Sequence, residues 1–147
     1  MTKNIFISII TIIIYVEIAF GQTKPSGMYV ARTLYHSVPA TDVNGFTSFK
    51  FQTGERPKGK YCFVFYNDHI TVKIAKYVSL RINKIDTKYS DDIKYFVTDP
   101  QGKHYQIIVY KNETGVYDSI DYFTLDKKGN PATLTKVILR NPPKLAQ

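Results

Sequence analysis

From residue 28 to residue 140, short segments rich in Tyr, Phe, Val, Ile and Thr are separated by turn-forming Gly, Pro, Asn and Asp. Within these segments apolar residues recur at every second position, the period of a β-strand with one buried face. The pattern predicts an all-β fold. The predicted strands cover residues 28–36, 45–52, 60–66, 69–75, 77–84, 92–99, 103–111, 117–125 and 132–140.

One predicted hairpin is centred on Asn67 and Asp68, two residue types that tolerate left-handed backbone angles. A turn fixes which residues face one another, and the period of two fixes which face they share. The pairs predicted across this turn are Phe65 with Ile70, Phe63 with Val72 and Tyr61 with Ile74. All six residues are apolar, so turn chemistry and facing pattern agree.

A second predicted hairpin turns at residues 99–102, with Pro100 where a type I turn favours proline and Gly102 where the backbone becomes left-handed. Its inward pairs are Val97 with Tyr105, Tyr95 with Ile107 and Ile93 with Val109. The opposite face mixes Phe96 and Ile108 with polar residues, which predicts a partly wet surface.

The sequence leaves the structure of two segments open. A turn at residues 126–129 implies a pairing that sets Ile120 opposite Lys136, so the sequence predicts the turn but not its register. Residues 69–84 contain no Gly or Pro, so they are read as two strands or as one long bent strand, with a helix as the alternative.

This many short antiparallel strands can bury one face only by closing into a barrel or by forming two packed sheets. A meander of sequential hairpins favours a single antiparallel β-barrel of the lipocalin-like kind, and a two-sheet β-sandwich is the close alternative. The chain has no Trp, so it lacks the Gly-x-Trp motif of lipocalins.

Residues 1–22 have the composition of an export signal: Lys3, an apolar run, and small residues Ala19 and Gly21 before Gln22. We expect residues 1–21 to be a cleaved secretory signal peptide, residues 22–140 a single β domain and residues 141–147 a short tail. The expected location is therefore secreted or periplasmic, with no stable membrane span after cleavage. An uncleaved signal anchor is the alternative.

The formal net charge is +8, and the lysines are scattered rather than clustered. An exported basic domain is attracted to an anionic glycan or to an acidic envelope or extracellular protein, and we expect no nucleic-acid partner. If the fold is a barrel, its mouth offers a place for a small apolar ligand. Cys62 is the only cysteine, which excludes an intrachain disulfide and predicts a packed thiol.

No pattern of catalytic or cofactor-binding residues appears. His36, His69 and His104 are too dispersed for a metal site, and no cofactor is predicted. Two carboxylates can act as acid and base only if the fold brings them together, and Asp118 and Asp121 are the candidates for that chemistry.

The tyrosines are the candidate contact residues, because exposed rings stack on sugars and anchor protein contacts. The predicted ligand- or partner-binding residues are Tyr66, Tyr77, Tyr89, Tyr110, Tyr117 and Tyr122. We expect a binding or interaction module without catalysis. The alternatives are an envelope-glycan hydrolase and an assembly component that pairs through edge strands such as residues 28–36 or 132–140.

Overall fold

The computed structural model describes residues 24–41, 43–45, 47–74, 76–88 and 92–140. Their regular structure is entirely β, and none of these residues belongs to a helix long and apolar enough to cross a membrane. The strands are β1 (Gly27–Thr41), β2 (Thr47–Phe51), β3 (Cys62–Phe65), β4 (His69–Lys73), β5 (Tyr77–Asp86), β6 (Asp92–Thr98), β7 (His104–Lys111), β8 (Tyr117–Leu125) and β9 (Pro131–Leu139).

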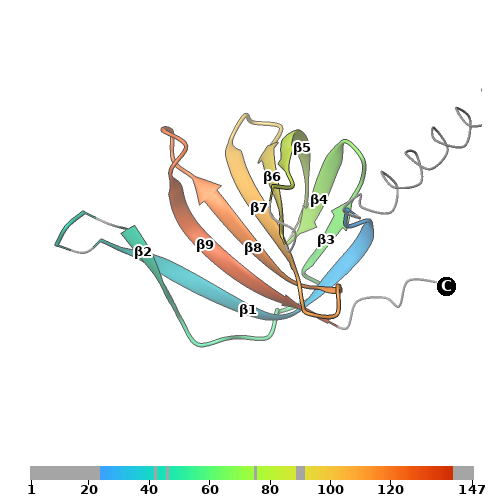
Figure 1. Cartoon of the computed structure of the whole chain (residues 1–147), viewed down its shortest axis with the longest axis horizontal. Helices are drawn as coiled ribbons and strands as arrows, with labels where there is room; N and C mark the ends of the chain where they lie inside the picture. Colours follow the sequence, from blue (N-terminus) through green and yellow to red (C-terminus); the bar gives the residue numbers. More distant parts are fainter. Residues whose placement is uncertain (1–23, 42, 46, 75, 89–91, 141–147) are drawn as a thin grey trace, which may run out of the picture.

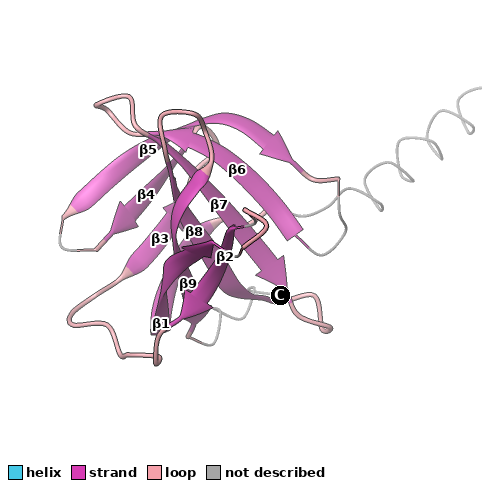
Figure 2. Ribbon diagram, turned by 90° about the vertical axis from the view of Figure 1, so that its left-hand side faces the viewer, coloured by secondary structure: helices cyan, strands magenta, loops and turns pink. Residues whose placement is uncertain are grey.

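The strands form one closed antiparallel barrel (Figures 1 and 2). β3 to β9 are joined in sequence as a meander, and β1 closes the ring by pairing with β3 through residues 27–30 and with β9 through residues 31–37. Eight strands therefore make the barrel, and β2 is an additional strand. The barrel prediction is confirmed. The prediction that residues 28–36 and 132–140 are free edges is wrong, because the two segments pair with each other.

β1 is longer than predicted and leaves the barrel with β2 as a two-stranded ribbon, visible on the left of Figure 1. The β1–β9 ladder ends at Ser37, which faces Leu134, and β1 then pairs only with β2. Pro39 explains this end: it occupies a non-hydrogen-bonded position opposite Phe49, so its nitrogen faces the side of β9 and has no hydrogen to donate.

The two predicted hairpins have the predicted registers. Phe65 faces Ile70 and Phe63 faces Val72 between β3 and β4, and all three apolar pairs predicted between β6 and β7 are present. The Tyr61–Ile74 pair is wrong, because β3 begins at Cys62 and β4 ends at Lys73, which leaves the Ile74 side chain 50% exposed. Gly102 has the left-handed φ of 84° that the second turn requires.

The turn between β8 and β9 is present, and a β-bulge sets its register. Leu125 faces Pro131, but Thr124 faces Thr133, so Ala132 is the extra residue. The shift places Ile120 opposite Val137 and Asp121 opposite Lys136. Without it, the implied pairing of Ile120 with Lys136 would put an ammonium group toward the core.

Residues 69–84 form two strands, so the helix alternative is wrong. β4 and β5 are antiparallel, with Ile70 facing Leu80 and Val72 facing Val78. β-Branched residues are frequent in this segment and suit a pleated strand better than a helix.

Side chains fill the barrel interior. Phe63, Ile70, Leu80, Ile93 and Ile107 are completely buried. Aromatic rings contact one another inside the barrel, with centroids 5.5 Å apart for Tyr29 and Phe65 on neighbouring strands. The distances across the interior are 5.6 Å for Phe65 and Tyr95 and 6.0 Å for Phe63 and Tyr122. An eight-stranded barrel is just wide enough for such filling.

Candidate functional site

Two of the predicted tyrosines are exposed rings. The Tyr66 side chain is 51% exposed and stacks on the His69 ring, with centroids 4.3 Å apart and planes inclined by 13°. Tyr77 is also exposed, and the Lys73 ammonium lies 4.9 Å from its ring centroid. Both rings are available for contact with a ligand or partner.

The other predicted tyrosines are placed differently. Tyr117 is a buried member of the core, and Tyr122 is partly buried and packs against it. Tyr110 is half-buried and donates a hydrogen bond to Asp121. Tyr89 lies outside the described residues. The described rings therefore do not form one binding patch, because Tyr also suits the half-buried positions of a sheet.

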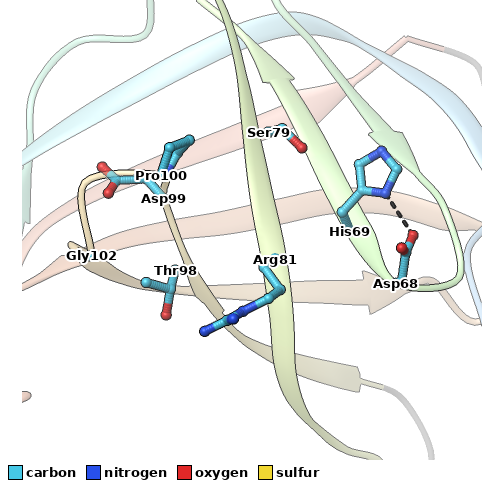
Figure 3. Close-up of a pocket in the computed structure, with 8 residues that line it drawn as sticks. All are labelled: Asp68, His69, Ser79, Arg81, Thr98, Asp99, Pro100 and Gly102. Carbon is cyan, nitrogen blue, oxygen red and sulfur yellow. Dashed lines mark hydrogen bonds and ion pairs between the residues drawn. The ribbon is translucent and has the colours of Figure 1, made fainter.

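A groove with a volume of about 520 Å³ lies on the outside of the barrel. We call it the outer groove, and Figure 3 shows its lining residues. They are Asp68, His69, Ser79, Arg81, Thr98, Asp99, Pro100 and Gly102. Ser79 and Arg81 on β5 form its centre; the turn at Asp68 borders one side, and the turn at residues 99–102 borders the other (Figure 3).

A cross-strand row of polar residues runs through the outer groove. His69 faces Arg81, Arg81 faces Thr98 and Thr98 faces His104, so four neighbouring strands contribute one residue each. These side chains point outward because their neighbours Ile70, Leu80 and Val97 are buried in the barrel. Thr98 is fixed by hydrogen bonds with Asn83 and with the His104 ring, the latter 3.1 Å long.

Both carboxylates of the outer groove are engaged by neighbouring protein groups. Asp68 Oδ1 lies 2.6 Å from His69 Nδ1, and this hydrogen bond lowers the pKa of Asp68. Partial desolvation acts to raise the pKa of Asp99, but hydrogen bonds from Lys103 N–H, Tyr105 O–H and Gln101 N–H outweigh it and hold that pKa below the usual range. Both groups are therefore ionised at neutral pH and held by hydrogen bonds.

Arg81 is the exposed cation at the centre of the groove, and it forms no ion pair with any carboxylate of the described residues. A guanidinium presents five N–H donors in a planar fork that matches a carboxylate, sulfate or phosphate. The groove therefore combines an accessible Arg with acidic groups that are hydrogen-bonded to other residues.

A smaller pocket of about 230 Å³ lies where the chain enters the barrel. We call it the mouth pocket. Buried Phe65 and Tyr95 and the partly buried Ile82 and Ile85 line its apolar side, and residues 24–26 lie across it. Tyr66 belongs to its lining, so this predicted residue stands between the two sites.

The two carboxylates named for hydrolysis have separate surroundings. Asp118 is partly buried, accepts a hydrogen bond from Ser119 and lines a pocket of about 240 Å³ that includes Arg32. Asp121 is buried, with Oδ2 hydrogen-bonded to Tyr110 and Oδ1 lying 3.6 Å from the Lys136 ammonium. Burial raises the pKa of Asp121, while Lys136 and Tyr110 partly oppose that change.

The predicted histidines have separate partners. His36 bonds to Glu55 and Thr135, His69 to Asp68, and His104 to Thr98. Within the described ranges, no group of three His, Cys, Asp or Glu is placed to hold a metal ion. Cys62 is completely buried, as expected of a packed thiol.

Sequence reasoning did not identify Arg81 or the outer groove. Once β4 and β5 are recognised as two strands, however, His69, Arg81 and Thr98 share the outward parity of their strands. The missing information was the pairing of β5, which the uninterrupted sequence of residues 69–84 left undetermined.

Comparison of the chain with protein-family models, curated proteins and solved structures gives no match. A β-barrel supports many unrelated functions, so function must be inferred from the site itself.

Proposed function

We propose that this chain is an exported β-barrel binding domain without catalysis, and that it binds an acidic saccharide in the outer groove. The main support is the exposed Arg81 guanidinium. It has no ion-pair partner among the described residues, although two carboxylates line the same groove. Because those carboxylates are hydrogen-bonded to other groups and not to Arg81, the guanidinium is left to receive an external anion.

Size favours the outer groove over the mouth pocket. Small-molecule sites usually measure about 300–1,000 Å³. The outer groove, at about 520 Å³, falls within this range, whereas the mouth pocket, at about 230 Å³, falls below it. The packed interior supports the same choice, because a ligand that entered the barrel would have to displace buried rings.

The other groups at the groove suit a sugar acid. Ser79 supplies an exposed hydroxyl at its centre, and the stacked rings of Tyr66 and His69 provide an aromatic edge beside it. Sugar rings pack on aromatic faces, while a uronic carboxylate matches the guanidinium fork. The net charge of +8 would steer such a ligand toward the domain.

The pKa values of the groove do not favour acid–base hydrolysis. A glycosidase needs one carboxylic acid that stays protonated near its working pH, which requires a raised pKa. Asp68 and Asp99 both have lowered pKa values. A binding role needs no such proton donor. The export component of the proposal rests on residues 1–22, and N-terminal sequencing of the mature protein tests it.

Titration calorimetry with a galacturonic acid tetrasaccharide tests the ligand, with the neutral galactose tetrasaccharide as its comparison. Arg81→Ala should weaken binding at least tenfold, since a hydrogen bond to a charged group contributes about 1.5–3 kcal/mol. Lys84→Ala is the matched control, because Lys84 is an exposed cation on the same strand outside the groove lining. Equal affinity of the Arg81 variant and the wild type would refute the proposal.

A further inference from the structure

We propose that the free edge of β2 is a docking strand for an extended acidic segment of a partner protein, which adds to the β1–β2 ribbon as a third strand. This interaction surface is separate from the outer groove, whose centre is on β5. Among the described strands, β2 pairs with β1 alone, so one edge of it is left without a strand partner.

Backbone alternation shows which groups point to that edge. Gln52 N–H donates to the His36 carbonyl over 2.8 Å, which makes His36 and Gln52 a hydrogen-bonded pair. Bonded and non-bonded pairs alternate in an antiparallel ladder, so Phe49 and Phe51 occupy non-bonded positions toward β1. Their N–H and C=O groups therefore point away from β1, in the arrangement that strand addition uses.

The ribbon is anchored and has apolar side chains on both faces. The Phe49 ring contacts the Phe123 ring of β8, with centroids 5.9 Å apart, which holds the ribbon to the barrel. The Phe51 side chain is 48% exposed on that face, and Val38 is 53% exposed on the opposite face. An added strand would therefore lie beside the exposed Phe51 ring on one face of β2 and beside Lys50 on the other face, which suits alternating apolar and acidic residues.

The charge beside this edge selects an acidic partner. Residues 52–60 continue from β2 along β1, because Leu34 and Glu55 exchange two backbone hydrogen bonds of 2.9 Å. Gly54 is so close to β1 that an added Cβ would lie 2.6 Å from the Tyr35 ring, which fixes the segment in place. Four exposed cations lie on β2 and this segment: Lys50, Arg56, Lys58 and Lys60.

No carboxylate among the described residues pairs with these four cations, and Glu55 is already engaged by His36 at 3.1 Å. A second copy of the chain would bring the same cations to the same edge and would carry the same net charge of +8. Repulsion between like charges therefore disfavours self-pairing. An extended segment with alternating apolar and acidic residues can instead hydrogen-bond to the outward backbone groups of β2 and pair its carboxylates with the cations.

The test uses the exported domain and an acetylated eight-residue peptide that alternates Glu and Val, at low salt. Backbone addition is tested by comparing Phe51→Pro with Phe51→Val: both remove the ring, but only proline removes the outward N–H. We expect Phe51→Pro to bind at least tenfold more weakly than Phe51→Val. Hydrogen exchange should show new protection of the Phe49 and Phe51 amides when the peptide is bound to the wild type.

Charge selection is tested with Arg56→Glu/Lys58→Glu, which should weaken binding at least tenfold. Lys76→Glu/Lys84→Glu makes the same charge change at exposed cations on the β4–β5 side and should leave affinity within twofold. A peptide alternating Lys and Val should not bind. Equal affinity of the two Phe51 variants, or protection confined to other strands, would overturn the docking strand. A concentration-dependent dimer abolished by Phe51→Pro would instead identify a second copy as the occupant.

Discussion

Tyr110 on β7 donates a hydrogen bond of 3.0 Å to Oδ2 of Asp121 on β8, and the other oxygen of that carboxylate is buried without a hydrogen bond. Asp121 is 7% exposed although it lies on the outer face of the barrel, where Lys136 faces it from β9. The carboxylate is thus partly compensated in a position where its charge is costly.

Asp121 should make stability fall as the pH rises. Its pKa in the folded protein is raised above the unfolded value, so the folded state loses stability as the pH increases through the folded pKa. Relative to Asp121→Asn, the wild type should lose on the order of 1 kcal/mol of unfolding free energy between pH 4 and pH 7. Urea unfolding at both pH values measures this difference, and a difference that is constant with pH would contradict the assignment.

Asp99 should have the opposite pH dependence. Its pKa is lowered in the fold, so its contribution to stability is present above the ordinary carboxyl pKa and is lost as the pH falls through the folded value. Asp99→Asn should destabilise the protein by about 1 kcal/mol at pH 7, a value kept small because the turn is partly solvated. Thermal unfolding should show the gap between the two proteins narrowing as the pH is lowered below the ordinary carboxyl pKa, and a gap that stays constant would argue against this cause.

Deletion of Ala132 should be tolerated, whereas deletion of Thr135 should be severely destabilising. Without Ala132, the Leu125–Pro131 and Thr124–Thr133 pairs become successive, so Lys136 still faces Asp121. Without Thr135, Lys136 moves to the inward position opposite Tyr122. We expect a loss of at least about 3 kcal/mol for the Thr135 deletion, because an unpaired ammonium would enter the core, and a smaller loss for the Ala132 deletion. Chemical denaturation that finds the two variants equally stable would show that the bulge does not set the register.

The Cys62 thiol should report unfolding. It is completely buried, so an aromatic disulfide reagent reaches it only when the surrounding strands open. We expect native labelling at least about a thousandfold slower than labelling in urea, in line with the stability of small domains. Fast labelling of the native protein would indicate that β3 opens locally.

Local chemistry predicted much of the fold. The hairpins at Asn67 and Pro100 could be placed because a short turn and the side-chain period fix the register together. The bulge at Ala132 could not be predicted, because it depends on packing in the closed barrel and no local sequence pattern marks it. The length of β1 was underestimated for a similar reason: Pro39 is acceptable only because one edge of the strand is unpaired there.

The candidate site was less predictable. The six tyrosines were chosen by residue type, and type does not distinguish the exposed Tyr66 from the core ring of Tyr117. Arg81 can be recognised as a site residue only when the pairing of β5 with β4 and β6 is known, because that pairing places His69 and Thr98 opposite it. A row of residues on neighbouring strands depends on how the strands pair, and the sequence of one strand alone does not show it.

Barrel closure also determines when this protein can fold. His36 and Thr135, which are hydrogen-bonded across the β1–β9 seam, are 99 positions apart in sequence. A contact of that separation forms only after a large loss of chain entropy, so we expect slow folding for a domain of this size. A chain whose β9 is not yet available would have β1 and β8 as unpaired edges, and protection by a chaperone would matter most at that stage.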